Sequence, residues 1–204
     1  MKSLDSAHIL YHDNHVFAAC KPKDMVTQPD FVESCKAWIK KEYKKPGNVF
    51  LEPIHRLDKV AGGIVLFART SKALSRLQKE MRERKIHKTY RATVEGILSK
   101  KEGTLCHFLI HDDYRATVDP KGKEAILHYK VLLQKKDRAE LEIGLETGRY
   151  HQIRAQFADI GHPILGDKKY GSSFALKEGI ALDHVRMEFE HPVTKERVII
   201  NSKI

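Results

Sequence analysis

The sequence predicts an α+β fold with one mixed, mainly antiparallel sheet flanked by helices. Short apolar segments typical of β-strands outnumber the helical patterns. The helical patterns fall between strands without regular alternation, which disfavours a parallel doubly wound sheet. The 204 residues contain no internal repeat or low-complexity linker and are enough for a sizeable core. We therefore expect a single domain over residues 1–204.

Short apolar runs bounded by turn residues predict strands at residues 9–11, 16–20, 64–68, 90–94, 125–133, 139–145, 181–189 and 197–201. The first two strands are joined at Asp13 and Asn14, residues that favour hairpin turns. Pro22 ends the second strand, because proline cannot donate to the ladder. The run at residues 64–68 is apolar throughout, which predicts a buried strand.

Apolar side chains at helical spacing predict helices at residues 32–43, 71–85 and 150–160. Ser71 is the expected N-cap of the second helix. That helix carries Leu74 and Leu77 on one face and basic side chains on the others, so it is amphipathic and basic.

The charge balance favours a polyanionic partner. The chain has 37 Lys and Arg against 27 Asp and Glu, a formal net charge of +10. The basic residues are spread along the chain, which suits a groove that follows a phosphate backbone better than a membrane-binding helix.

The sequence also favours a cytoplasmic location. No apolar run approaches the ~20 residues that a membrane helix needs, and Asp5 falls where an export signal would be apolar. Cys20, Cys35 and Cys106 are an odd number without a Cys-x-x-Cys pair, which suits a reducing compartment.

Catalytic chemistry is concentrated in a few segments. Residues 55–58, His-Arg-Leu-Asp, place an acid beside an arginine just before a pair of glycines. Residues 148–154, Gly-Arg-Tyr-His-Gln-Ile-Arg, gather donors and positive charge at the start of a predicted helix. Tyr90, two residues after Lys88 on a predicted strand, is positioned to stack on a base if it is exposed, or to pack as a half-buried strand aromatic.

Two enzyme classes, metal hydrolases and glycosidases, fit the sequence poorly. His107 and His111 are four residues apart, but no Glu stands between them and the stretch reads as β-type, so we expect no metal site. A glycosidase normally needs two carboxylates. Asp167 is a possible second acid, although Gly166 and Asp167 are more simply a turn.

These motifs together resemble the RluA-type pseudouridine synthases over roughly residues 8–201. The matching segments, in order, are residues 9–11 through 21–22, 55–58, 63–70, 88–92, 148–154, 160–167 with 170–171, and 191–194. The His-Arg-Leu-Asp form of the second segment points to this branch of the family. We expect no N-terminal S4 RNA-binding domain, because the chain begins almost at the first motif.

The resemblance implies a role for each site residue in a cleft that holds RNA. Asp58 matches the catalytic aspartate, and Arg154 matches the arginine that pairs with it and lowers its pKa. Tyr90 matches the tyrosine that stacks on the target uracil. His55 and Arg56 match residues that fill the gap left by the flipped uridine. RNA contacts near the site are expected from Lys88 and Arg149.

The resemblance further implies an RNA pseudouridine synthase that isomerises uridine in structured ribosomal or transfer RNA. The reaction needs no cofactor and no metal, and we expect a monomer. A non-catalytic RNA-binding protein on the same scaffold is the alternative. Asp58, Tyr90 and Arg154 favour the enzyme, because a pure binder has no use for a carboxylate that repels phosphate.

The sequence departs from the usual family pattern close to these motifs. Val60 stands where an acid is common, and residues 61–63, Ala-Gly-Gly, replace Thr-Ser-Gly. Residues 182–184, Leu-Asp-His, replace Leu-His-Ala. No group that the chemistry requires is lost.

Overall fold

The computed structural model describes residues 6–202, which divide into two compact units. The first unit contains the chain up to residue 86 together with residue 184 onward, and the second contains residues 87–183. The expectation about an export signal rests mainly on residues 1–5, which lie outside the described part. None of the helices in residues 6–202 has the length and apolarity of a membrane span.

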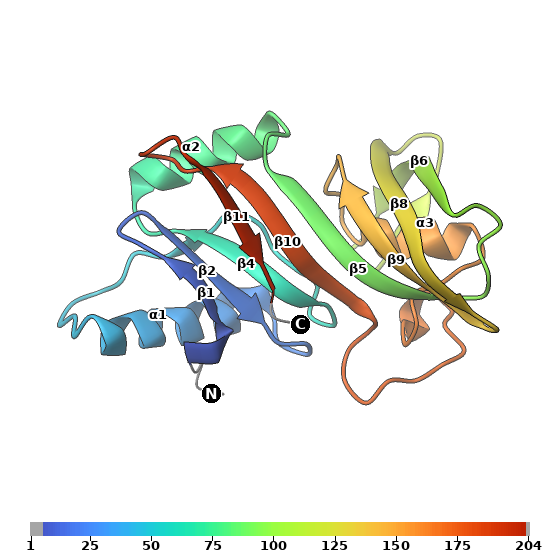
Figure 1. The fold of residues 1–204 in the computed structure, drawn as a ribbon, viewed down its shortest axis with the longest axis horizontal. Helices are drawn as coiled ribbons and strands as arrows, with labels where there is room; N and C mark the ends of the chain where they lie inside the picture. The colour runs from blue at the N-terminus through green and yellow to red at the C-terminus, as the bar shows by residue number, and fades with distance from the viewer. Residues whose placement is uncertain (1–5, 203–204) are drawn as a thin grey trace. The chain divides into compact units, whose positions relative to one another are not determined.

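In the first unit the strands follow the order β1-β2-β4-β10-β11, and the short β3 also pairs with β4 (Figure 1). Their bounds are Ile9–His12 for β1, Val16–Lys21 for β2, Glu52–Pro53 for β3, Gly62–Ala68 for β4, Leu182–Glu190 for β10 and Arg197–Asn201 for β11. The pairings β1–β2, β2–β4 and β10–β11 are antiparallel. The strands predicted in this unit are confirmed to within about two residues at each end.

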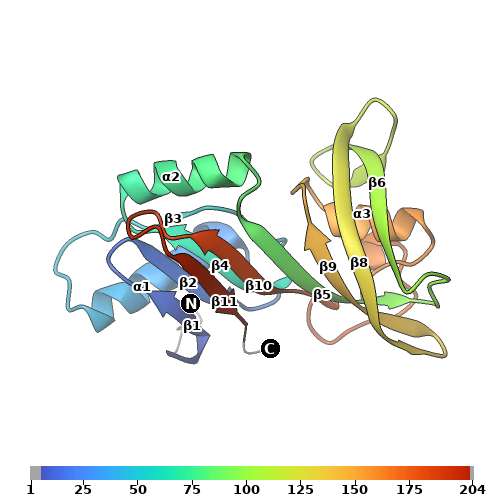
Figure 2. The same cartoon turned by 45° about the horizontal axis from the view of Figure 1, so that its top comes forward.

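Two helices cover opposite faces of these strands, α1 (Val32–Glu42) and α2 (Ser71–Arg82) (Figures 1 and 2). Val16 and Leu66 pack in one buried cluster with Leu77 of α2. On the other face, the ring of Phe17 lies 5.7 Å from that of Trp38 in α1. Because both faces are covered, β2 and β4 are apolar at nearly every position.

The N-cap of α2 is Thr70, one residue before the predicted Ser71. The Thr70 side chain accepts the N–H of Ala73 at 3.1 Å, and its backbone is extended (φ −143°, ψ 153°). An N-cap residue needs this non-helical backbone, whereas Ser71 is already helical. The helix ends at Arg82, earlier than the predicted residue 85.

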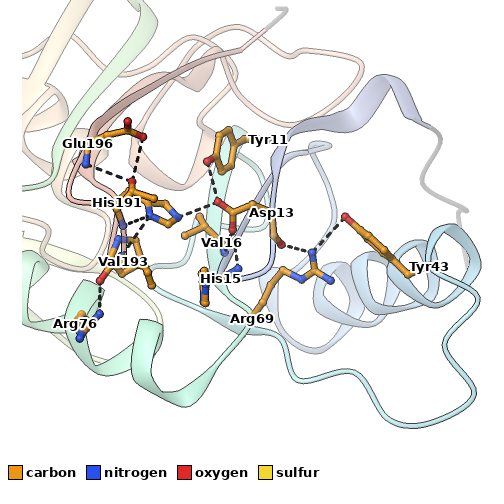
Figure 3. Close-up of polar contacts among 12 residues, drawn as sticks. Tyr11, Asp13, His15, Val16, Tyr43, Arg69, Arg76, His191, Val193 and Glu196 are labelled. Carbon is orange, nitrogen blue, oxygen red and sulfur yellow. Dashed lines mark hydrogen bonds and ion pairs between the residues drawn. The ribbon is translucent and has the colours of Figure 1, made fainter.

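A hydrogen-bonded cluster around Asp13 ties the β1–β2 turn to the segment after β10 (Figure 3). The Asp13 carboxylate accepts the hydroxyl of Tyr11 at 2.8 Å and the ring Nε2 of His191 at 2.9 Å. It also accepts the backbone N–H groups of His15 and Val16 at 2.6 and 2.7 Å. Burial alone would raise the pKa of Asp13, but these donors together lower it below its ordinary value.

The ring of His191 is bonded on both nitrogens. Its Nδ1 accepts the backbone N–H of Val193 at 3.3 Å and of Thr194 at 3.0 Å. The ring proton is therefore assigned to Nε2, which donates to Asp13. Burial of Tyr11, together with the donation of its own hydroxyl to the Asp13 carboxylate, raises the pKa of Tyr11 to about 12.

The second unit is an antiparallel sheet in the order β5-β9-β8-β6-β7. The bounds are His87–Glu95 for β5, Glu102–His111 for β6, Ala116–Val118 for β7, Lys123–Lys135 for β8 and Arg138–Leu145 for β9. The strands predicted at residues 90–94, 125–133 and 139–145 are confirmed. Neither β6 nor β7 was among the predicted strands, although the stretch at residues 107–111 was expected to be β-type. The α+β class with a mainly antiparallel sheet is confirmed.

Helix α3 (Gln152–Asp159) packs on one face of this second sheet. Its Phe157 ring meets Tyr129 of β8 edge-on, with the centroids 5.8 Å apart. The helix begins two residues after the predicted start, because His151 has a left-handed backbone (φ +50°) that ends the preceding turn.

Candidate active site

Asp58 lies half-buried in the loop between β3 and β4. Its carbonyl accepts the N–H of Ala61 at 3.1 Å, which closes a turn. The preceding residue, Leu57, is held through both of its backbone polar groups by one buried side chain. Thr27 Oγ1 donates to the Leu57 carbonyl at 3.0 Å and accepts the Leu57 N–H at 3.1 Å.

The residue after Asp58 is held from the other side by Lys21, whose side chain is completely buried. Its Nζ donates to the carbonyl of Lys59 at 3.3 Å and to those of Pro22 and Met25 at 2.9 and 2.8 Å. A buried ammonium needs such acceptors for its protons. Thr27 and Lys21 therefore fix the backbone on both sides of Asp58.

His55 and Arg56 come from the same loop but have different surroundings. His55 is half-buried, its Nε2 accepts the backbone N–H of Leu66 at 3.3 Å, and its ring meets His184 edge-on at 5.4 Å. These contacts hold the ring in place beside β4. Arg56 is exposed, as a residue that enters an RNA stack would have to be.

Gly63 is the glycine that the segment after Asp58 shares with the usual family pattern. Its backbone is left-handed (φ +109°), and a Cβ there would collide with the backbone of His184. His184 is fully buried and bonds through Nδ1 to the carbonyl of Ile64 at 2.7 Å. Gly63, which the family pattern keeps, thus packs against His184, a residue that departs from that pattern.

Tyr90 lies on β5 in the second unit and is only 7 % exposed. Only a small part of the Tyr90 side chain is therefore open to a base. Tyr90 shares one face of the strand with Lys88, since side chains two residues apart point the same way. Burial lowers the pKa of Lys88 below its ordinary value.

Lys88 and the turn before α3 lie together. A Cβ added to Gly148 would come within 3.2 Å of Lys88 Nζ, so glycine leaves room for the ammonium. Next along the chain, Arg149 is exposed; its Nε donates to the carbonyl of Glu124 at 2.9 Å. Its backbone N–H donates to the side chain of Gln152 at 3.0 Å.

Arg154 is buried on α3 and pairs with Asp167. Two parallel bonds join them, from Nε to Oδ2 at 2.6 Å and from one terminal nitrogen to Oδ1 at 2.9 Å. Such a bidentate pair fixes the plane of the guanidinium. The predicted pairing of Arg154 with Asp58 joins residues of different units and stays a prediction.

The aromatic ring of Tyr170 packs against the guanidinium group of Arg154. The guanidinium carbons of Arg154 and Arg115 each lie 4.9 Å from the Tyr170 ring centroid. The Tyr170 hydroxyl accepts the N–H of Ala116 at 2.8 Å and contacts Nδ1 of His151 at 2.9 Å. Burial raises the pKa of this hydroxyl.

The structure thus gathers the predicted site residues into two groups. His55, Arg56 and Asp58 share one loop of the first unit, while Lys88, Tyr90, Arg149 and Arg154 belong to the second. Sequence reasoning missed the supports, Lys21, Thr27, Asp167 and Tyr170. A signal existed for Lys21, a charged residue that ends an apolar run, and for Asp167 and Tyr170, which lie in segments of the resemblance.

Comparison with known proteins gives consistent matches. A family model described as RNA pseudouridylate synthase matches residues 15–159. An uncharacterized RNA pseudouridine synthase of Bacillus subtilis is 34 % identical over 94 % of this chain and 66 % of its own length. Ribosomal large subunit pseudouridine synthase D of Vibrio cholerae is 30 % identical over 97 % of this chain and 67 % of its own. The chain thus spans about two thirds of the length of these relatives.

Among solved structures, the human RNA pseudouridylate synthase domain containing 4 has a similar fold. The TM-score is 0.82 at 20 % identity, over 96 % of this chain and 88 % of that one.

Proposed function

The chain belongs to the RNA pseudouridylate synthase family, and we propose that it isomerises uridine to pseudouridine in structured ribosomal or transfer RNA. Asp58 is the catalytic carboxylate in this proposal. The observation that carries it is the support of the Asp58 loop, where buried Thr27 and Lys21 hold the neighbouring residues. A catalytic group must be held in place in this way, because a misplacement of about 1 Å can cost about 100-fold in rate.

The proposed isomerisation requires one carboxylate that acts on the ribose of the target uridine. The N1–C1′ bond breaks, the uracil turns, C5 bonds to C1′, and C5 loses its proton while N1 gains one. Asp58 acts either as the nucleophile at C1′ or as the base at C2′. The isomerisation is redox-neutral, so the proposal includes no cofactor and no metal.

The remaining roles are divided between the two units. Tyr90 packs against the target uracil, and Arg154 pairs with Asp58 with its guanidinium oriented by Asp167. Arg56 and His55 occupy the gap left by the flipped uridine. Lys88 and Arg149 contact RNA beside the site. The two units work as one catalytic domain in this account.

The proposed substrate sets the cellular context. The ribosomal large subunit is named in the relative from Vibrio cholerae, and the net charge of +10 suits a nucleic acid. We place the protein in the cytoplasm as a monomer, where its three cysteines stay reduced.

The test uses unmodified ribosomal and transfer RNA labelled with tritium at uridine C5. Forming the new bond must expel this hydrogen, so release into water reports the reaction. We expect release with the wild-type protein and none with Asp58→Ala. No release from either RNA, together with tight and salt-sensitive binding, would instead identify a non-catalytic RNA-binding protein.

A further inference from the structure

A hollow on the surface of the second unit is lined by cations and aromatic rings. His111 from the end of β6 and Lys123 from the start of β8 line it, together with Gly148, Arg149 and Tyr150 from the turn before α3. Apolar side chains of β6 complete the lining, and no carboxylate contributes to it.

The aromatic part is held in place from behind. Tyr150 stacks on the buried ring of His151, with the centroids 3.9 Å apart and the planes at 18°. His151 is fixed in turn by its bond to the Tyr170 hydroxyl at 2.9 Å. On the hollow side, the Tyr150 and His111 rings are 5.2 Å apart and inclined at 47°, and Tyr150 remains 38 % exposed. A rigid, partly exposed ring suits base stacking, because little side-chain entropy remains to be lost.

The cationic part lacks a carboxylate partner. In the described part of the chain, neither Lys123 nor Arg149 forms an ion pair, and the bond from Arg149 goes to the Glu124 carbonyl. Two neighbouring cations without a carboxylate partner are suited to bind the phosphate group attached to a stacked base.

From these contacts we infer that the hollow is a nucleotide subsite of the RNA, with a base against Tyr150 and His111 and its phosphate on Arg149 and Lys123. The inference rests on the proposed function for its ligand class. Gly148 borders both the hollow and Lys88, so the bound nucleotide is one that flanks the target uridine rather than the target itself.

The first test measures binding of a short fluorescein-labelled single-stranded uridine RNA by anisotropy, in the full chain carrying Asp58→Asn so that no turnover occurs. Tyr150→Ala should weaken binding roughly 5- to 140-fold, the range expected for loss of one stacked base. Tyr150→Phe keeps the ring and should bind within about twofold of its parent. The matched control is Tyr43→Ala, which removes an equally exposed tyrosine (38 %) from the first unit. Equal losses in both alanine variants would overturn the inference.

The second test addresses the phosphate and uses a surface substitution that does not threaten folding. Lys123→Gln should lower the slope of log K against log salt by about 0.7, the value for one contact to a single strand. Lys121→Gln, two residues away and outside the hollow, should leave the slope unchanged. An unchanged slope in Lys123→Gln contradicts the subsite.

Tritium release separates this inference from the proposed function. If the wild type releases tritium while Tyr150→Ala binds RNA normally, the subsite is wrong and the activity stands. If the wild type releases none but Tyr150→Ala and Lys123→Gln show the expected losses, the subsite stands and the activity is wrong.

Discussion

Charged residues in this molecule form ion pairs that differ greatly in burial. Arg154 and Asp167 are joined by two bonds in the interior, with side chains 4 % and 2 % exposed. Arg138 and Asp137 form a bidentate pair of the same kind at the surface. Removing one partner of a buried pair leaves an uncompensated charge, whereas an exposed pair is solvated by water.

Asp167→Asn should therefore destabilise the protein by about 3–5 kcal/mol, measured by urea unfolding. It should also slow tritium release, because Arg154 loses its fixed orientation. The control Asp137→Asn should leave the unfolding midpoint nearly unchanged. Similar midpoints for the two variants would contradict the structural role of the buried pair.

A substitution at Asp58 should affect the reaction without weakening RNA binding. Asp58→Asn should abolish tritium release and leave RNA affinity equal or slightly higher, because one negative charge that repels phosphate is removed. Filter binding and tritium release on the same RNA would measure both. Normal release by this variant would remove Asp58 from the mechanism.

At the scale of elements, the loop between β3 and β4 depends on contacts that come from elsewhere in the chain. Thr27 precedes α1, and Lys21 ends β2, yet both hold the peptides next to Asp58. No local sequence pattern encodes such a support, since it arises only when distant segments are packed.

Thr27→Val keeps the shape of the side chain but removes both hydrogen bonds to Leu57. We expect kcat to fall about tenfold or more with KM little changed, because the carboxylate moves while the RNA contacts remain. Thr27→Ser retains the hydroxyl and should restore most of the rate. If KM rises instead and kcat stays constant, Thr27 acts on binding rather than on Asp58.

The Asp13 cluster makes the stability of the first unit depend on pH. The folded-state pKa of Asp13 lies below its ordinary value, so its contribution is present above the unfolded-state pKa, about 4, and is lost as pH falls through the folded value. Asp13→Asn should thus destabilise the protein at pH 7 and progressively less toward pH 3, measured by chemical unfolding. Asp113→Asn, an exposed acid, should show little effect at either pH.

For the whole molecule, the net charge of +10 governs association with RNA. Released counterions should make affinity for unmodified RNA fall steeply between low and physiological salt, by about tenfold or more. Binding isotherms at several salt concentrations would measure the slope. A flat response would mean that the positive surface does not follow the phosphate backbone.

Much of this architecture could be predicted from sequence. The apolar runs located the strands that carry the core, and the ordered motifs point to Asp58, Tyr90 and Arg154 as site residues, an assignment that stays a prediction. Strand β7 was missed because Ala116–Val118 is too short for a pattern. The pairing of Arg154 with Asp167 was missed because their side chains meet only in three dimensions, 13 residues apart along the chain.

Helices on both faces of β2 and β4 should affect how these strands unfold locally. Amide protons of Val65 and Phe67, in a strand with no exposed residue, should exchange with deuterated water only through global unfolding. The Asp58 loop leads directly into this strand and is pinned by Lys21 at the end of its neighbour. We therefore expect the carboxylate to be anchored to the strand that exchanges most slowly in its unit, so that local opening at the sheet edges leaves its position intact.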